Sequence, residues 1–196
     1  MPYVASLPEI DVGRFWFDVL VYGNGTDAIV IRNATPDDYL AISMLTVQAY
    51  ETAGQLDVEV DYRDTLADVA GRASAGEMFV AVDGDDVLGA VLLVHPGSSY
   101  AELAGPGEAE FRMLAVSPAA QRRGIGERLV TACLDRARAD GATCVVISSR
   151  DFVEAPLRLY ARMGFVRDPE RDWSPVAGVH LIAWRFDLVP VAEAGH

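Results

Sequence analysis

Apolar and polar residues follow two different periods along the chain, and each period predicts one kind of element. Segments with a two-residue period or a short β-branched run predict strands, which we expect at 14–21, 28–32, 78–82, 87–94, 111–116, 143–148 and 179–188, with a further strand starting at Phe165. Helical segments are expected at 36–52, 61–72, 155–163 and from a glycine loop near residue 124 to about Asp140. This order of elements predicts an α/β fold.

Turn and cap residues divide these elements. Gly23-Asn24-Gly25 and Asp83-Gly84-Asp85 each separate two expected strands, so both are predicted to be hairpin turns. Thr35-Pro36-Asp37-Asp38 has a cap residue, a first-turn proline and acidic residues, which is typical of a helix start. Gly164 is expected to end the helix at 155–163.

The hexapeptide Gln121-Arg122-Arg123-Gly124-Ile125-Gly126 follows an apolar strand and opens an amphipathic helix. The first backbone N–H groups of a helix have no intrahelical acceptor, and the helix dipole adds positive charge there. Gly124 allows a bulky ligand to approach the backbone, and Gly126 keeps the helix start clear of a side chain. The pattern therefore predicts a phosphate or pyrophosphate site. It lacks the third glycine of a dinucleotide fingerprint and the Gly-Lys-Ser/Thr of a nucleotide P-loop.

Composition restricts the classes of protein that remain. The 196 residues suit one domain, and a formal net charge of −13 argues against binding to a nucleic-acid backbone. No segment has the apolar length needed to cross a membrane, and Met1–Ile10 does not resemble a signal peptide. Cys133 and Cys144 are expected to be buried free thiols, and no Cys/His cluster has metal-ligand spacing. We expect a cytoplasmic protein without a metal.

Three segments together resemble the GNAT superfamily of N-acetyltransferases. They are Ile31-Arg32 followed by the helix start at 35–38, the hexapeptide at 121–126, and Leu159-Tyr160-Ala161-Arg162-Met163-Gly164-Phe165, which looks like the family's L-Y-x-x-x-G-F. The resemblance covers roughly residues 28–188. It implies a mixed, mostly antiparallel sheet flanked by helices and splayed between its fourth and fifth core strands. Residues 1–27 are then an N-terminal extension with room for an extra strand, and 189–196 a tail.

The resemblance also implies acetyl-coenzyme A as the acetyl donor. In the family, the loop amides and helix start hold the pyrophosphate, while the preceding strand pairs with the pantetheine arm as an added strand would. The coenzyme-binding residues implied here are Leu114, Ala115, Val116, Gln121, Arg122, Arg123, Gly124, Ile125, Gly126 and Glu127.

Acetyl transfer to an amine requires one group that removes a proton from the ammonium and another that protonates the leaving thiolate. By the resemblance, Tyr160 is the candidate general acid, Glu110 the candidate general base, and the Val116 N–H the candidate oxyanion donor. Period two places Glu110, Arg112, Leu114 and Val116 on one face of the strand. The alternative for Tyr160 is a core aromatic, and for Glu110 a structural carboxylate paired with Arg112. Water relays are the alternative to a glutamate base.

The acceptor is a primary amine of a small molecule or a protein, and the sequence does not distinguish them. Trp173 either lines the acceptor site or covers a sheet edge. The acidic stretch Glu51 to Asp64 either attracts a cationic acceptor or is a solvated face, and Phe15-Trp16-Phe17 is either a homodimer surface or part of a core hairpin. A second class of function also stays open, in which a GNAT-like domain binds coenzyme A as a sensor or assembly module without catalysis.

Overall fold

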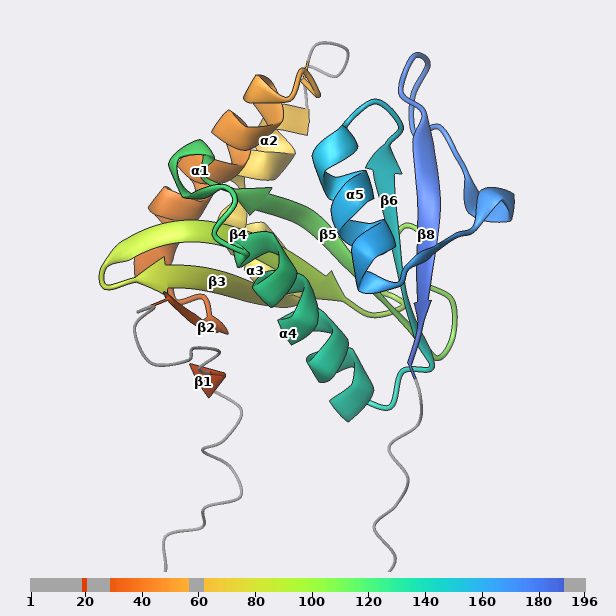
Figure 1. Cartoon of the computed structure of the whole chain (residues 1–196), viewed down its shortest axis with the longest axis horizontal. Coiled ribbons are helices and arrows are strands. Elements are labelled where there is room, and N and C mark those ends of the chain that lie inside the picture. The colour runs from red at the N-terminus through yellow and green to blue at the C-terminus, as the bar shows by residue number, and fades with distance from the viewer. Residues whose placement is uncertain (1–18, 21–28, 57–61, 189–196) are drawn as a thin grey trace, which may run out of the picture.

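The computed structural model describes residues 19–20, 29–56 and 62–188 (Figure 1). Within these residues, eight strands form one sheet in the order β1-β2-β3-β4-β5-β6-β8-β7. All neighbours are antiparallel except β5 and β6, which are parallel, so the expected mixed, mostly antiparallel sheet is confirmed. The strands are β1 (Val19–Leu20), β2 (Ile29–Asn33), β3 (Glu77–Asp83), β4 (Asp86–Val94), β5 (Glu108–Val116), β6 (Cys144–Arg150), β7 (Val166–Arg167) and β8 (Leu181–Asp187).

Helices cover both faces of the sheet (Figure 1). Alternating residues of β3 and β4 point to opposite faces: Val80 and Leu92 pack with α1 and α3, whereas Phe79 and Leu93 belong to the core around α4. Both faces of these central strands are therefore buried. The helices are α1 (Tyr39–Thr52), α2 (Tyr62–Ala67), α3 (Val69–Ala75), α4 (Ile125–Ala139) and α5 (Glu154–Met163), with short 3-10 turns at Pro36–Asp38, Pro118–Ala120 and Pro169–Arg171.

The expected single helix at 61–72 was wrong, because two helices, α2 and α3, occupy this region. Asp68 interrupts the helical backbone between them, with ψ of 74°, and its carboxylate accepts a hydrogen bond from the Gly71 N–H at 2.9 Å. A carboxylate that caps a backbone N–H competes with a continuous helix. The helical period alone did not reveal this internal cap.

The N-terminal hairpin lies only partly within the described residues. Val19 pairs with Arg32 and Leu20 with Ile31, antiparallel, as expected for the first two strands. The turn at Gly23-Asn24-Gly25 and the aromatic run Phe15-Trp16-Phe17 lie outside the described residues.

The sheet splays between β5 and β6, the fourth and fifth strands counted from β2. Their ladder runs from the pair Glu108 and Cys144 to the pair Glu110 and Val146, and β6 then continues to Arg150 against β8 alone. The two strands diverge toward the end of the sheet where α5 lies (Figure 1). The expected splay is therefore confirmed, and it opens a space beside the last six residues of β5.

A β-bulge in β5 changes which residues share a face. Ala90 pairs with Ala115 but Leu92 pairs with Arg112, so β5 contains one extra residue between them, and Met113 has a positive φ of 55°. Phe111 belongs to the core around α4, and beyond the bulge Leu114 and Val116 pack against the same core. The prediction that Glu110, Arg112, Leu114 and Val116 share one face was therefore wrong. The extra residue reverses the alternation of side chains along the strand.

Hydrogen bonds around the Glu108 carboxylate link β5 to β6 at the end where the two strands still pair. Glu108 accepts hydrogen bonds from the Arg171 guanidinium at 2.7 and 2.9 Å and from the Gly105 N–H at 2.9 Å. Cys144, its partner across the ladder, donates its thiol to the same carboxylate at 3.3 Å. The bond from Arg171 lowers the pKa of Glu108 to about 2. The carboxylate is therefore charged at neutral pH and ties the turn at 169–171 to the closed end of the splay.

Candidate active site

A groove with a volume of about 400 Å³ lies along the motif loop and the splayed part of β5. Nine of the ten residues that the resemblance implied for coenzyme binding line it, the exception being Arg123. Another wall comes from helix α5, with Ala155, Pro156, Leu159 and Arg162, and from Val153 immediately before it. The lining residues are Ala49, Tyr50, Ala53, Gln55, Leu114, Ala115, Val116, Ala120, Gln121, Arg122, Gly124, Ile125, Gly126, Glu127, Val153, Ala155, Pro156, Leu159 and Arg162.

The loop backbone suits a pyrophosphate. Gly124 has a φ of 75°, and a Cβ built there meets nothing within 4 Å, so the backbone faces open space. The first intrahelical bond of α4 runs from the Arg128 N–H to the Gly124 carbonyl at 3.1 Å. The N–H groups of 125–127 precede it at the positive end of the helix dipole, where an anion is stabilised. The described residues thus fit the diphosphate of coenzyme A.

The splayed edge of β5 offers backbone groups to an extended ligand. The Ser117 N–H donates to the Leu88 carbonyl at 2.9 Å, so this pair is hydrogen-bonded and the next pair, Val116 with Gly89, is not. The Val116 N–H consequently points away from β4 and toward the splay. This orientation agrees with its expected use as a donor to an oxyanion or to a pantetheine carbonyl.

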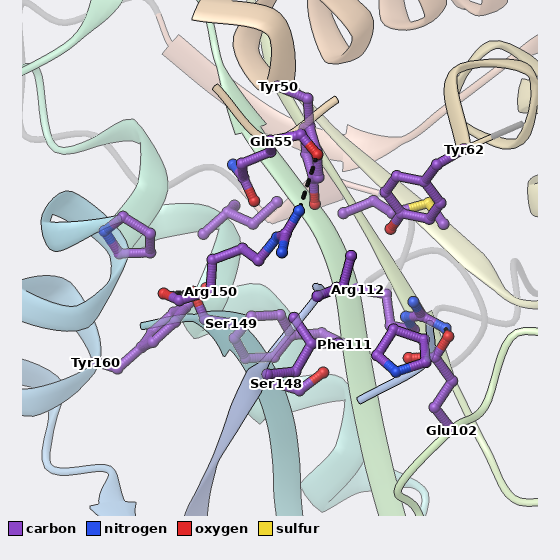
Figure 2. A pocket seen from close by; sticks show the side chains of 16 residues that line it. Tyr50, Gln55, Tyr62, Glu102, Phe111, Arg112, Ser148, Ser149, Arg150 and Tyr160 are labelled. Carbon is purple, nitrogen blue, oxygen red and sulfur yellow. Dashed lines mark hydrogen bonds and ion pairs between the residues drawn. The ribbon is translucent and has the colours of Figure 1, made fainter. Parts of the chain in front are cut away.

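A second cavity, of about 120 Å³, lies between β5, β6 and the end of α1 (Figure 2). Tyr50, Gln55, Leu114 and Pro156 line both this cavity and the groove, so the two spaces meet at these residues. The lining residues of the cavity are Tyr50, Gln55, Tyr62, Glu102, Phe111, Arg112, Met113, Leu114, Ser148, Ser149, Arg150, Pro156, Tyr160, Pro175, Val179 and Leu181.

Tyr160 lines the cavity but not the groove. It lies on α5, and its ring packs against Phe111, Phe165 and Trp184 with centroid distances of 5.8, 5.6 and 6.5 Å. Burial raises the pKa of the phenol above its ordinary value, so the hydroxyl keeps its proton at neutral pH. The residue therefore combines the packing of a core aromatic with a protonated hydroxyl at the cavity wall.

Glu110 is fully buried and does not line the cavity. Its Oε2 accepts hydrogen bonds from the backbone N–H groups of Glu102, Leu103 and Ala104 at 2.8, 2.8 and 3.1 Å. Its Oε1 lies 3.8 Å from the Arg112 Nε and accepts no hydrogen bond from the residues that the structure describes. This arrangement favours the interpretation in which Glu110 holds the loop at 102–104 and pairs with Arg112.

Two further candidates lie away from the openings. Arg123 is not in the groove lining, and its guanidinium forms an ion pair with Asp83 of β3 at 3.0 Å. Trp173 does not line the cavity, although its loop supplies Pro175. Trp173 instead bridges to Leu181 at the edge of β8, with backbone hydrogen bonds of 2.9 and 3.0 Å.

Sequence reasoning placed no charged residue at the cavity, although it named Arg112 as the alternative partner of Glu110. Arg150 ends β6, Arg112 comes from β5, and Glu102 comes from the Gly- and Pro-rich loop before β5. Glu102 and Arg112 are joined by an ion pair of 2.5 Å. The sequence signal for Arg150 was a single arginine at the end of a buried β-branched strand, which has many structural explanations. On the groove side, Arg162 was also missed, and it pairs with Glu127 at 2.9 Å.

The chain belongs to the acetyltransferase (GNAT) family, whose model matches residues 41–165. The match includes the motif loop, the splayed strand and Tyr160, which form the groove and the cavity. A search among curated proteins gave no significant match.

Solved structures share the fold at low sequence identity. A putative acetyltransferase from Salmonella typhimurium, determined with its cofactor acetyl-CoA, is 22% identical over 83% of this chain and 95% of its own, with a TM-score of 0.61. The ribosomal-protein-S18-alanine N-acetyltransferase of Escherichia coli is 17% identical over 86% and 99%, with a TM-score of 0.62. A Bacillus subtilis acetyltransferase in complex with CoA is 21% identical over 82% and 98%, with a TM-score of 0.56.

The described ranges contain neither a candidate metal site nor a candidate membrane-spanning helix. No three His, Cys, Asp or Glu side chains in residues 19–20, 29–56 and 62–188 gather as metal ligands. Helices in the same part of the chain are all too short or too polar to cross a bilayer.

Proposed function

We propose that the protein is an N-acetyltransferase that moves the acetyl group of acetyl-CoA to a primary amine. The main support for this proposal is that the groove and the cavity adjoin each other. The groove suits the coenzyme, the cavity suits an acceptor, and they meet at Tyr50, Gln55, Leu114 and Pro156. The binding of acetyl-CoA and of CoA by structures with the same fold supports the choice of donor.

The reaction forms one bond and breaks another at the acetyl carbon. The neutral amine nitrogen attacks the thioester carbonyl, the C–N bond forms, and the C–S bond breaks with its electron pair on sulfur. The nitrogen loses one proton as ammonium before attack and another as the amide forms, while the thiolate gains one. The Val116 N–H is directed into the splay, and we assign it to the carbonyl oxygen as negative charge develops there.

Tyr160 is our candidate for the group that meets the sulfur. Its phenol lies at the cavity wall and remains protonated because burial raises its pKa. A phenol with a raised pKa is a weaker acid than an ordinary thiol, so complete transfer of its proton to a thiolate is uphill. We therefore expect Tyr160 to stabilise the leaving sulfur by donating a hydrogen bond as the C–S bond breaks, and the thiolate then takes its proton from water.

Removal of the ammonium proton needs a path out of the cavity. Glu110 does not line the cavity, and three backbone N–H groups occupy its Oε2. We propose that water carries the proton, either to solvent or to the Oε1 of Glu110, which has no hydrogen-bond donor within the described part of the chain. The pH dependence of a Glu110→Gln variant distinguishes these two destinations.

The test is an acetyl-CoA turnover screen across small-molecule and peptide amines, with release of the CoA thiol and the mass of the acetylated product as readouts. The proposal predicts both signals together for at least one class of amine. Tight coenzyme binding with neither signal across the panel would contradict it and favour a coenzyme A sensor or assembly module.

A further inference from the structure

Arg150 places a nearly buried positive charge at the cavity. It is 6% exposed, it lines the cavity, and its guanidinium reaches from the end of β6 toward Gln55 (Figure 2). Its hydrogen bonds are long: 3.3 Å to the Gln55 carbonyl and 3.5 Å to the Gly178 carbonyl. Within the described residues, no carboxylate forms an ion pair with it. The guanidinium carbon also lies 5.5 Å from the centroid of the Phe152 ring. A nearly buried guanidinium whose hydrogen bonds are long and go to neutral carbonyls still lacks the carboxylate that would compensate its charge.

The second arginine of the cavity, Arg112, differs from Arg150 because carboxylates pair with it. Arg112 pairs with Glu102 at 2.5 Å, lies 3.8 Å from Glu110 and donates to the Tyr100 carbonyl at 2.9 Å. Its charge is therefore already compensated by carboxylates of the same chain. Arg150 is the cavity cation that still lacks such a partner among the residues described.

The coenzyme does not account for the charge on Arg150. Arg150 does not line the groove, and the fit for the diphosphate is at the motif loop, around Gly124. Ser148 and Ser149 also line the cavity beside Arg150, and the Ser149 hydroxyl donates to the Arg150 carbonyl at 3.4 Å. The surroundings of Arg150 therefore suit an anionic group on the acceptor.

We propose that the acceptor is a small amino acid-like molecule that carries a carboxylate beside its amine, and that Arg150 binds this carboxylate. The inference rests on the proposed function and adds its substrate class. A planar guanidinium matches a carboxylate through two parallel hydrogen bonds. A dianionic phosphate would leave one charge uncompensated, because Arg112 is already paired. A volume of about 120 Å³ suits a short molecule in which the anion and the amine lie close together.

The experiment compares a panel of L-amino acids with their carboxamides, in which a neutral amide replaces the carboxylate. More of the carboxamide amine is neutral at a given pH, so a preference for the acid reports recognition and not availability of the amine. The wild type is expected to show a kcat/KM at least about 10-fold higher for its best acid than for the matching carboxamide, since hydrogen bonds between charged groups contribute at this level.

Arg150→Gln should lower kcat/KM for the acid by about 10- to 100-fold and leave the carboxamide within about threefold, so that the ratio approaches one. Arg150→Lys, which keeps the charge without the planar fork, should give an intermediate ratio. Arg158→Gln is the matched control, because Arg158 is exposed on α5 and lines neither space. A purely structural role for Arg150 would lower both rates together and keep the ratio, and that result would overturn the inference.

A binding readout separates this inference from the proposed function. The same acids and carboxamides are added to the protein with CoA, and the melting temperature is measured. Turnover of neutral amines with no acid preference in either readout overturns the carboxylate site and keeps the acetyltransferase. Absence of turnover, together with an acid-specific melting shift that Arg150→Gln removes, supports the carboxylate site and contradicts the acetyltransferase. If neither turnover nor an acid-specific shift appears, both are overturned.

Discussion

The groove and the cavity meet at four residues, but they are built in different ways. The groove takes most of one wall from a single stretch of chain, 114–127, and offers backbone N–H groups, glycines and apolar side chains. The cavity takes its charged groups from three separate places, Glu102, Arg112 and Arg150, and its aromatic wall from α1, α2, β5 and α5. Backbone groups of the protein therefore recognise the ligand in the groove, whereas side chains select the ligand in the cavity.

This difference teaches where specificity lies. Backbone recognition at a glycine loop tolerates many changes of side chain, so one coenzyme can be shared across a fold at about 20% identity. The charged side chains of the cavity are not needed for coenzyme binding, so they can differ between proteins of the same fold. We therefore expect mutations in the groove to abolish coenzyme binding and mutations in the cavity to change which acceptor is used.

The largest effect is expected for Gly124→Asp. Acetyl-CoA at about a hundred times its Kd should stabilise the wild type by roughly 2.7 kcal/mol. The substitution places a carboxylate where the diphosphate binds, so the melting shift with acetyl-CoA should vanish. Gly97→Asp is the matched control: Gly97 also has a positive φ, of 92°, and open space around its Cβ, but it lies outside the groove. An undiminished shift in Gly124→Asp would remove the loop from the coenzyme site.

Tyr160→Phe should lower turnover by about 100- to 1,000-fold, the usual range for loss of one hydrogen-bond donor to a developing charge, while acetyl-CoA affinity stays near the wild-type value. The phenyl ring keeps its packing against Phe111 and Phe165, and the residue does not line the groove. Tyr39→Phe, outside both spaces, serves as the control. A turnover within about twofold of wild type would leave Tyr160 with a packing role only.

Glu110→Gln tests how the cavity wall is held. The amide cannot accept charge-assisted bonds from three N–H groups or compensate Arg112, so the protein should lose roughly 2 kcal/mol of stability, about 4–8 °C in melting temperature. The shape of the pH profile of kcat/KM should stay that of the wild type if solvent receives the proton. Loss of an acidic limb from that profile, with partial rescue at high pH, would instead make Glu110 the destination of the proton.

The smallest effect is expected at the closed end of the splay. The pKa of Glu108 is lowered to about 2 in the folded protein, mainly by the hydrogen bond from Arg171. A lowered pKa contributes stability that is present above the unfolded value of about 4.3 and is lost as the pH falls toward 2. Glu108→Gln should therefore flatten the loss of stability between about pH 4.3 and 2, measured by denaturant titration at each pH. An unchanged slope would mean that this carboxylate is not linked to folding.

The sequence was informative where local chemistry decides the structure. The hexapeptide at 121–126 predicted the loop and the start of α4, and the L-Y-x-x-x-G-F segment predicted α5 and its end at Gly164, which has a φ of 94°. Two predictions from the hydrophobic period were wrong, each because of a single residue that does not change the apolar pattern. Asp68 capped α3 inside an apparently continuous helix, and the bulge at Met113 reversed the faces of β5.

The cavity was much less predictable than the groove. Arg150, Arg112 and Glu102 come together only because β5 bulges, β6 separates from it and the loop at 102–104 is held by Glu110. Each of these residues taken alone resembles an ordinary surface charge in the sequence. Their pairing state, which distinguishes Arg112 from Arg150, depends on contacts between distant segments.

The division of the site into a coenzyme groove and an acceptor cavity is tested most directly by melting shifts of the wild type, Gly124→Asp and Arg150→Gln. Acetyl-CoA is added alone to each protein, and an L-amino acid is added in the presence of CoA at a concentration that still saturates the wild type. Gly124→Asp should lose the acetyl-CoA shift, and Arg150→Gln should keep that shift and lose only the amino acid shift. Loss of the acetyl-CoA shift in Arg150→Gln, or its retention in Gly124→Asp, would contradict the division.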